Sequence, residues 1–259
     1  AYQLKKYDEA LEGYNYAIGR AKNIFTEKSL IRAADIHYFR KNFSDAKLMF
    51  AVLEEVAEVE HNLINSRIGL MRCNYELGEY DDAIRYAEKV TTMEKIQDDV
   101  LNEAYLIIAK SALAQEKEGL ALAQFSKVEG LSQTAVGAEA HYNVAAIQYS
   151  QGNYDVSEKT IIDLISNRPS YPYWVAKAFI LLADNYVAKD DDFQAKLTLQ
   201  NLIDNYDGTD LKAIAQEKLN NIIQRENDAE LMKEMKIKEE IYIPVSYTHL
   251  RAHETKANL

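Results

Sequence analysis

The chain has 259 residues, of which 47% are hydrophobic and 27% charged, and its formal net charge at pH 7 is −11. This composition argues against global disorder, and the acidic excess disfavours nucleic acid and anionic membrane surfaces as partners. With nine glycines, three prolines and a single cysteine, Cys73, the sequence does not suit a turn-rich all-β fold, and it has no intrachain disulfide or cysteine-based metal site. No apolar run of about 18 residues predicts a membrane span.

A small residue recurs at a nearly constant interval along the chain. The gaps are 36, 37, 38, 36 and 38 residues, between Ala10, Ala46, Ala83, Ala121, Ser157 and Ala195. In four copies an aromatic residue stands three positions earlier, as Tyr7, Phe43, Tyr80 and Tyr154. A period of this size indicates one supersecondary unit stacked on itself.

Each period predicts two amphipathic helices. Within residues 64–92, an apolar first helix ends at Gly78, and apolar residues from Tyr80 recur at three- and four-residue spacing on a second helix. A small residue lets two antiparallel helices approach closely, and the aromatic residue fills the space beside that contact. In residues 97–130 the turn lacks both Gly and Tyr, so the prediction there depends on spacing. Residues 1–5 are interpreted as the end of a truncated first helix.

The pattern changes after residue 206. Thr209 or Asp210 can cap a helix that runs to about residue 224, and the charged segment 225–240 continues it. We therefore expect a repeat array over residues 1–208, a capping and charged helix over 209–240, and an irregular tail over 241–259. Residues 246–259 follow neither the period nor the composition and resemble translated sequencing-adapter read-through, so we expect the natural protein to continue differently after about residue 245.

The repeated units resemble tetratricopeptide repeats. Leu77-Gly78-Glu79-Tyr80 matches the turn of that family, and its first-helix pair is matched by Ala33-Ala34, Leu70-Met71, Ile108-Ala109, Val144-Ala145 and Leu182-Ala183. The resemblance implies an all-α fold, a right-handed α-solenoid of about five to six helix pairs with a C-terminal capping helix. The stretch from Trp174 to Tyr206 also resembles the last repeats of long bacterial envelope-type tetratricopeptide proteins. This second resemblance implies that the protein is located in the bacterial periplasm or cell envelope, and it does not exclude the cytoplasm.

The sequence contains no catalytic signature. It has no Gly-rich phosphate loop, nucleophile elbow or paired zinc motif, and its acidic pairs sit in turns, where Asp starts helices. His249 and His253 have helical metal-ligand spacing but no third ligand. His37 is interpreted as a packed core residue, and His61 and His141 as surface or interface residues. We therefore predict no enzyme activity, no cofactor and no metal site.

The resemblance further implies that the first helices line a concave face and contact a protein or peptide there. The row transferred from the family mixes acidic and basic residues, unlike the all-basic carboxylate clamp of chaperone-binding relatives, so a C-terminal carboxylate ligand is not implied. The tyrosines in the adjacent rows are either partner contacts or packing residues for the neighbouring repeat. The predicted partner-binding residues are Asp35, Tyr38, Arg72, Tyr75, Lys110, Tyr142, Tyr149 and Asp184.

Two functions are compatible with these patterns. The first is a non-catalytic protein–protein interaction scaffold that binds a protein or peptide on its concave face. The alternative is a structural spacer, or a segment of a longer repeat protein that associates with itself through the open N-terminal end. Light scattering discriminates between them, because the second function requires association of the chain.

Overall fold

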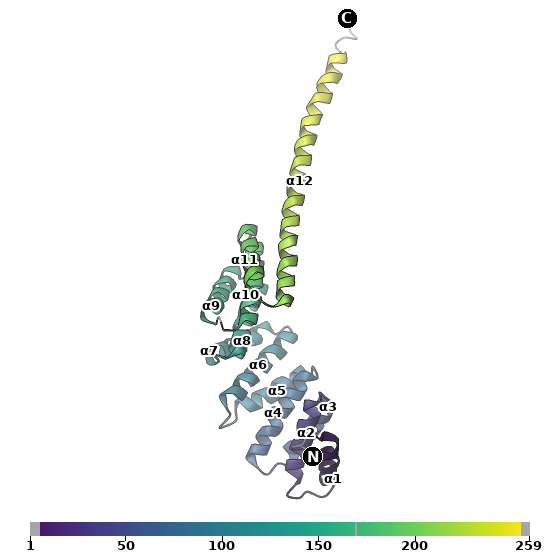
Figure 1. Cartoon of the computed structure of the whole chain (residues 1–259), viewed down its shortest axis with the longest axis vertical. Coiled ribbons are helices and arrows are strands. Elements are labelled where there is room, and N and C mark those ends of the chain that lie inside the picture. Colours follow the sequence, from purple (N-terminus) through teal and green to yellow (C-terminus); the bar gives the residue numbers. More distant parts are fainter. Residues whose placement is uncertain (1–5, 169, 255–259) are drawn as a thin grey trace. The chain divides into compact units, whose positions relative to one another are not determined.

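The computed structural model describes residues 6–168 and 170–254, with side chains up to residue 238. These residues form twelve helices and no strand (Figure 1). They divide into two compact units, the first ending at Tyr171 and the second starting at Pro172. The first unit contains α1 (Tyr7–Ile18), α2 (Thr26–Phe39), α3 (Phe43–Val56), α4 (Glu60–Glu76), α5 (Tyr80–Thr91), α6 (Asp98–Ala114), α7 (Glu118–Leu131), α8 (Ala135–Ser150) and α9 (Tyr154–Asn167). The second contains α10 (Pro172–Ala188), α11 (Asp192–Asn205) and α12 (Thr209–Glu254).

The helices form pairs in the order that the repeat predicts. The pairs are α2/α3, α4/α5, α6/α7 and α8/α9 in the first unit and α10/α11 in the second, and within each unit every helix packs on the next. Contacts also join α2 to α4, α4 to α6 and α6 to α8, so these first helices share one side of the first unit. Helix α1 packs on α2 ahead of the first complete pair; the expected end of a truncated helix at residues 1–5 lies outside the described residues. The all-α repeat fold is confirmed.

All five turns within the pairs have the same backbone geometry. A left-handed residue stands five positions before the small residue, with φ between 59° and 76°: Lys41, Gly78, Glu116, Gly152 and Asp190. The N–H that follows it bonds to the carbonyl five residues earlier, as from Glu79 to Asn74 and from Lys117 to Ala112. This is the Schellman motif that commonly ends helices. The pair over residues 97–130, predicted from spacing, is thus confirmed although its turn contains neither Gly nor Tyr.

The recurring small residues occupy the contact between the two helices of a pair. Ala46, Ala83, Ala121, Ser157 and Ala195 are completely buried. The one hydroxyl in this set has a partner, because Ser157 Oγ donates to the carbonyl of Ala145 on α8 at 2.9 Å. In the α10/α11 pair the position three residues before Ala195 is Asp192, and the aromatic residue next to it, Phe193, is 65% exposed.

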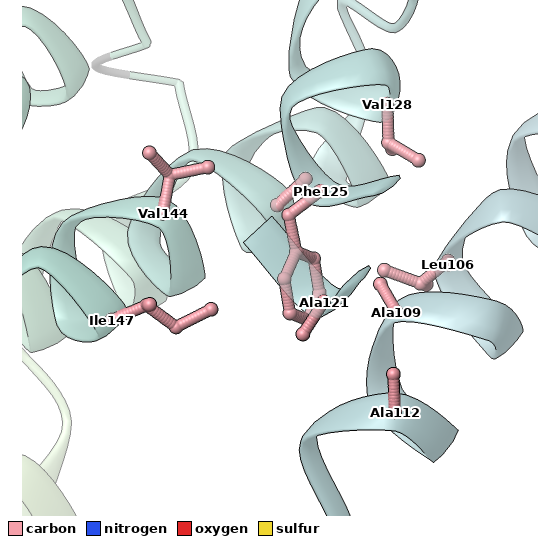
Figure 2. Close-up of a cluster of buried hydrophobic side chains, with 9 residues drawn as sticks. Leu106, Ala109, Ala112, Ala121, Phe125, Val128, Val144 and Ile147 are labelled. Atoms are coloured by element: carbon pink, nitrogen blue, oxygen red, sulfur yellow. The ribbon is translucent and has the colours of Figure 1, made fainter. Parts of the chain in front are cut away.

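Hydrophobic side chains fill the space between successive helices. Figure 2 shows the cluster at α6, α7 and α8, where the ring of Phe125 points between the other two helices. Phe125 is fully buried, and burial of such a side chain contributes about 1.5–3 kcal/mol. The cluster consists of Leu106, Ala109, Ala112, Ala121, Phe125, Val128, Ala140, Val144 and Ile147.

Helix α12 begins at Thr209, as predicted, and packs its first turns on the α10/α11 pair. The contacts come from Leu211, Ala215, Leu219 and Ile222, which recur at helical spacing. Residues 227–238 are exposed. The helix continues to Glu254, so the prediction of an irregular tail from residue 241 is wrong up to that point. Residues 225–240 are rich in Glu, Lys and Met, which favour helices, but residues 241–254 are not. Residues 255–259 lie outside the described residues, and the adapter read-through stays a prediction.

Every helix in the described part of the chain is too short or too polar to cross a bilayer.

Candidate functional site

A groove of about 1040 Å³ lies between α2 and α4 of the first unit. Its α2 wall consists of residues spaced by three and four positions, which puts them on one face of that helix. The same spacing applies on α4. The lining residues are Lys28, Ile31, Arg32, Asp35, Tyr38 and Phe39 from α2, His61, Asn62, Asn65, Ile68, Gly69, Arg72 and Glu76 from α4, and Lys41, Phe43 and Phe50 from the segment between them.

A glycine and a phenylalanine meet in this groove. A Cβ atom on Gly69 would lie 2.4 Å from atoms of the Phe50 ring, much closer than van der Waals contact. Phe50 is 6% exposed and packs in the core with Leu30, Leu53 and Leu70. Gly69 therefore lets α4 lie directly against the ring, and any larger residue would displace it.

The predicted tyrosines pack first against aromatic residues of their own repeats. Tyr38 meets Phe43 edge-on with ring centroids 5.3 Å apart. The same five-residue relationship joins Tyr75 to Tyr80 at 6.3 Å and Tyr149 to Tyr154 at 5.5 Å. Burial raises the pKa of both Tyr38 and Tyr75. The rings thus stabilise the turn of each pair. Of these three tyrosines, Tyr38 lines the groove.

The predicted charges are held in ion pairs with the following first helix. Arg72 Nε and Nη2 donate to the two carboxylate oxygens of Glu103 on α6, each at 2.6 Å. Lys110 pairs with Glu139 on α8. Asp184, in the second unit, pairs with Lys218 of α12 at 2.7 Å. These pairs link neighbouring repeats.

Asp35 lies in the groove between two cations. Burial raises the pKa of its carboxyl group, and the positive charges of Arg32 and Arg72 oppose that rise. The nearer contact joins Arg32 Nη1 to Asp35 Oδ2 at 3.4 Å. This acidic residue therefore offsets part of the positive charge along the α2 wall.

The structure brings three of the eight predicted residues together. Asp35, Tyr38 and Arg72 line the groove; Tyr75, Lys110, Tyr142 and Tyr149 lie further along α4, α6 and α8, and Asp184 lies in the second unit. The sequence analysis missed Lys28, Arg32 and His61. The signal was available for Lys28 and Arg32, since they precede Asp35 on α2 by seven and three residues and so share its face.

One histidine is placed differently from its prediction. His141, interpreted as a surface or interface residue, is 3% exposed because it lies in the middle of α8 and faces α7 and α9. Its Nε2 atom lies 3.3 Å from Glu129 of α7 and 3.6 Å from Asp163 of α9. The three side chains have donor atoms within 4.8 Å of one another, close enough to hold a metal ion. The prediction of no metal site did not take this cluster into account.

Comparison with known proteins agrees with the fold. Residues 177–209 match the tetratricopeptide repeat family. No curated protein matches the sequence of the chain. Among solved structures, MamA is similar with a TM-score of 0.58 at 17% identity, over 70% of this chain and 91% of that one. YrrB, a TPR protein with an unusual peptide-binding site, gives 0.57 at 17% identity, over 80% of this chain and 99% of that one.

A third similar structure holds nearly identical TPR-like repeats from Podosopora anserina, with a TM-score of 0.55 at 13% identity, over 70% of this chain and 95% of that one. Identities this low speak for the fold alone. The repeat period, the five helix pairs of the described residues and the family match in α10/α11 agree with one another. The chain therefore has the fold of tetratricopeptide-repeat proteins, and its residues 177–209 match the model of that family.

Proposed function

We propose that the groove between α2 and α4 binds a segment of a partner protein, an acidic peptide that carries an aromatic or large aliphatic side chain. The observation that carries this proposal is the combination of cations and exposed aromatic surface in one groove. Lys28, Arg32 and Lys41 line it together with Arg72, which Glu103 holds, and with the acidic Asp35 and Glu76, in a chain whose net charge is −11. A local basic groove on an acidic protein attracts an acidic segment and repels most of the protein's own surface.

The apolar part of the groove supplies the anchor. Phe39 is 73% exposed, and it lines the groove together with Tyr38 and Ile31. Aromatic side chains in a concave site bury large areas on binding and dominate the energy of many interfaces. A hydrophobic side chain of the peptide would cover Phe39, while its carboxylates would face Lys28 and Arg32.

The solved structures support a protein-interaction role in general. YrrB has a peptide-binding site, and this chain shares its fold. Binding on the concave face stays a prediction from the family resemblance, and the groove between α2 and α4 is the specific form in which we propose it. We propose no catalytic step for this groove.

Fluorescence anisotropy with labelled peptides tests the proposal. The probes are acidic peptides with one Phe or Leu and matched peptides in which Lys replaces Glu and Asp. We expect the acidic peptides alone to bind, and the double variant Lys28→Glu, Arg32→Glu to lose about tenfold or more in affinity. A matched double variant on α12, Lys212→Glu with Lys233→Glu, changes the net charge equally and should leave binding intact.

Equal binding of the acidic and basic peptides would contradict the electrostatic part of the proposal. Unchanged affinity in the groove variant would show that the peptide binds elsewhere. Replacement of Phe39 by Ala tests the anchor separately, because it removes the exposed ring and leaves the charges in place.

The spacer function remains the alternative. It requires the chain to associate with itself, so light scattering at increasing concentration should show a mass above that of one chain. A monomer at all concentrations, together with peptide binding, would favour the scaffold.

A further inference from the structure

We propose that Glu129, His141 and Asp163 form a binding site for one zinc ion. The three residues come from three consecutive helices, α7, α8 and α9. They line a cleft of about 560 Å³, distinct from the groove proposed to bind a peptide. The sequence offers no motif for this site, because the residues follow one another at gaps of 12 and 22 positions.

The donor atoms have the spacing that a tetrahedral zinc ion requires. Bonds of about 2.0–2.1 Å place two ligand atoms of a tetrahedral site about 3.3–3.4 Å apart. His141 Nε2 lies 3.3 Å from Glu129 Oε1 and 3.6 Å from Asp163 Oδ2. The ligand atoms of the three side chains all lie within 4.8 Å of one another.

The surroundings hold two of the ligands in position. His141 is 3% exposed and is locked by the packing of α8. Asp163 Oδ1 accepts a hydrogen bond from Asn167 Nδ2 at 2.7 Å, which leaves Oδ2 directed at the imidazole. Such supporting hydrogen bonds orient metal ligands and strengthen binding.

The charges in the cleft also fit a divalent cation. Two carboxylates lie next to the imidazole of His141, and a neutral imidazole is a common metal ligand. Two positively charged side chains also lie near these three residues. Arg168 donates to the carbonyls of Ser132 and Glu129 at 2.8 and 2.9 Å, and Lys159 lines the cleft.

The donor set favours zinc among the common ions. Calcium and magnesium prefer sites built from oxygen atoms alone, whereas an imidazole nitrogen with carboxylates suits zinc. Three protein ligands leave a fourth coordination position for water or a side chain of a partner. A bound ion would tie α7, α8 and α9 together and stabilise the first unit.

Isothermal titration with zinc chloride tests this site. The experiment uses the untagged full chain after treatment with a chelator, since a polyhistidine tag binds zinc. It also needs the background variant His249→Ala, His253→Ala, because these two histidines are four residues apart and could hold zinc by themselves. We expect one zinc ion per chain in this background and a rise in melting temperature on zinc addition.

In that background, Asp163→Asn and Glu129→Gln should each weaken zinc binding by at least about tenfold. The Asp163 side chain is 57% exposed, so its replacement keeps the fold, and circular dichroism verifies this. The control Glu55→Gln removes an exposed carboxylate of α3 in the same unit and should leave zinc binding unchanged.

Three results would overturn the proposal. They are the loss of all zinc binding with His249 and His253, zinc affinity undiminished in Asp163→Asn and Glu129→Gln, and tighter binding of calcium than of zinc.

Discussion

The guanidinium group of Arg72 on α4 donates two hydrogen bonds to the carboxylate of Glu103 on α6, both at 2.6 Å. A residue predicted to meet a ligand thus links the first helices of two successive repeats. The pair of Lys110 with Glu139 repeats this relationship one unit further along the chain. Because each pair crosses from one repeat to the next, these charges contribute to the interfaces on which the stability of a solenoid depends.

A double-mutant cycle with Arg72→Gln and Glu103→Gln measures the strength of this pair. Both side chains are about one-third exposed, at 38% and 32%, so water screens the pair. We expect a coupling energy of about 0.5–1 kcal/mol in urea unfolding. The exposed pair of Arg85 with Asp82 within α5 serves as the comparison and should couple more weakly. A coupling energy of zero for Arg72 and Glu103 would mean that the pair adds nothing to the interface.

Replacement of Glu116 by Gly should stabilise the protein. Glu116 has φ of 59° in the turn between α6 and α7, a conformation that L-residues adopt at a cost and glycine adopts freely. We expect a gain of about 0.5 kcal/mol, seen as a higher melting temperature. The reverse change, Gly78→Ala at φ of 73°, should cost about 1 kcal/mol. A destabilised Glu116→Gly variant would contradict the backbone geometry of this turn.

Replacement of Gly69 by Ala should destabilise the α3/α4 interface. The new methyl group would lie 2.4 Å from the ring of Phe50, so the ring or the helix must move at a cost of about 1–3 kcal/mol. Gly13→Ala is the matched control, since a Cβ there meets nothing within 4 Å and alanine favours the helix.

A second change separates this clash from other effects of the substitution. In the background Phe50→Leu the ring is absent, so Gly69→Ala should cost far less there than in the wild type. Thermal unfolding of the four variants gives the comparison. An equal cost in both backgrounds would show that the destabilisation does not come from the ring.

Stability should depend on pH through Glu54. Burial by itself raises the pKa of this carboxyl group, but hydrogen bonds from Arg67, Lys89 and Tyr86 outweigh it and lower the pKa in the folded state. A lowered folded-state pKa means that the ionised group stabilises the fold above its usual pKa of 4.5 and that this contribution is lost as the pH falls through the folded-state value.

The variant Glu54→Gln should therefore unfold at a lower temperature than the wild type at pH 7, with a loss of about 1–2 kcal/mol. The difference should shrink as the pH falls below 4.5 and through the lowered folded-state pKa of Glu54, because both proteins then carry an uncharged side chain. Melting curves between neutral and acidic pH measure this, with the exposed neighbour Glu55→Gln as the control. A difference that does not change with pH would exclude an effect of the charge.

The helix pairs could be predicted from the sequence because their determinants are local. Ala83 has Tyr80 three positions before it and Ala121 has no such aromatic residue, yet both lie in the same kind of helix pair. The reason is that close packing of two helices requires only a small residue at a regular interval. The end of α12 was predicted less well. The repeat says nothing about residues after 208, and the helix continues past the expected boundary through residues 241–254, although this stretch contains Pro244 and few strong helix formers.

Only the tertiary structure decided which side chains are available for function. Whether Arg72 faces a ligand or Glu103 depends on how α4 packs against α6, and the meeting of Glu129, His141 and Asp163 depends on how α7, α8 and α9 pack together. The sequence by itself determined that helices form, where they turn and which faces are buried, because these depend on residues within about one repeat. Contacts between polar side chains of different repeats depend on the angle by which one helix pair is rotated against the next. The hydrophobic period does not determine that angle.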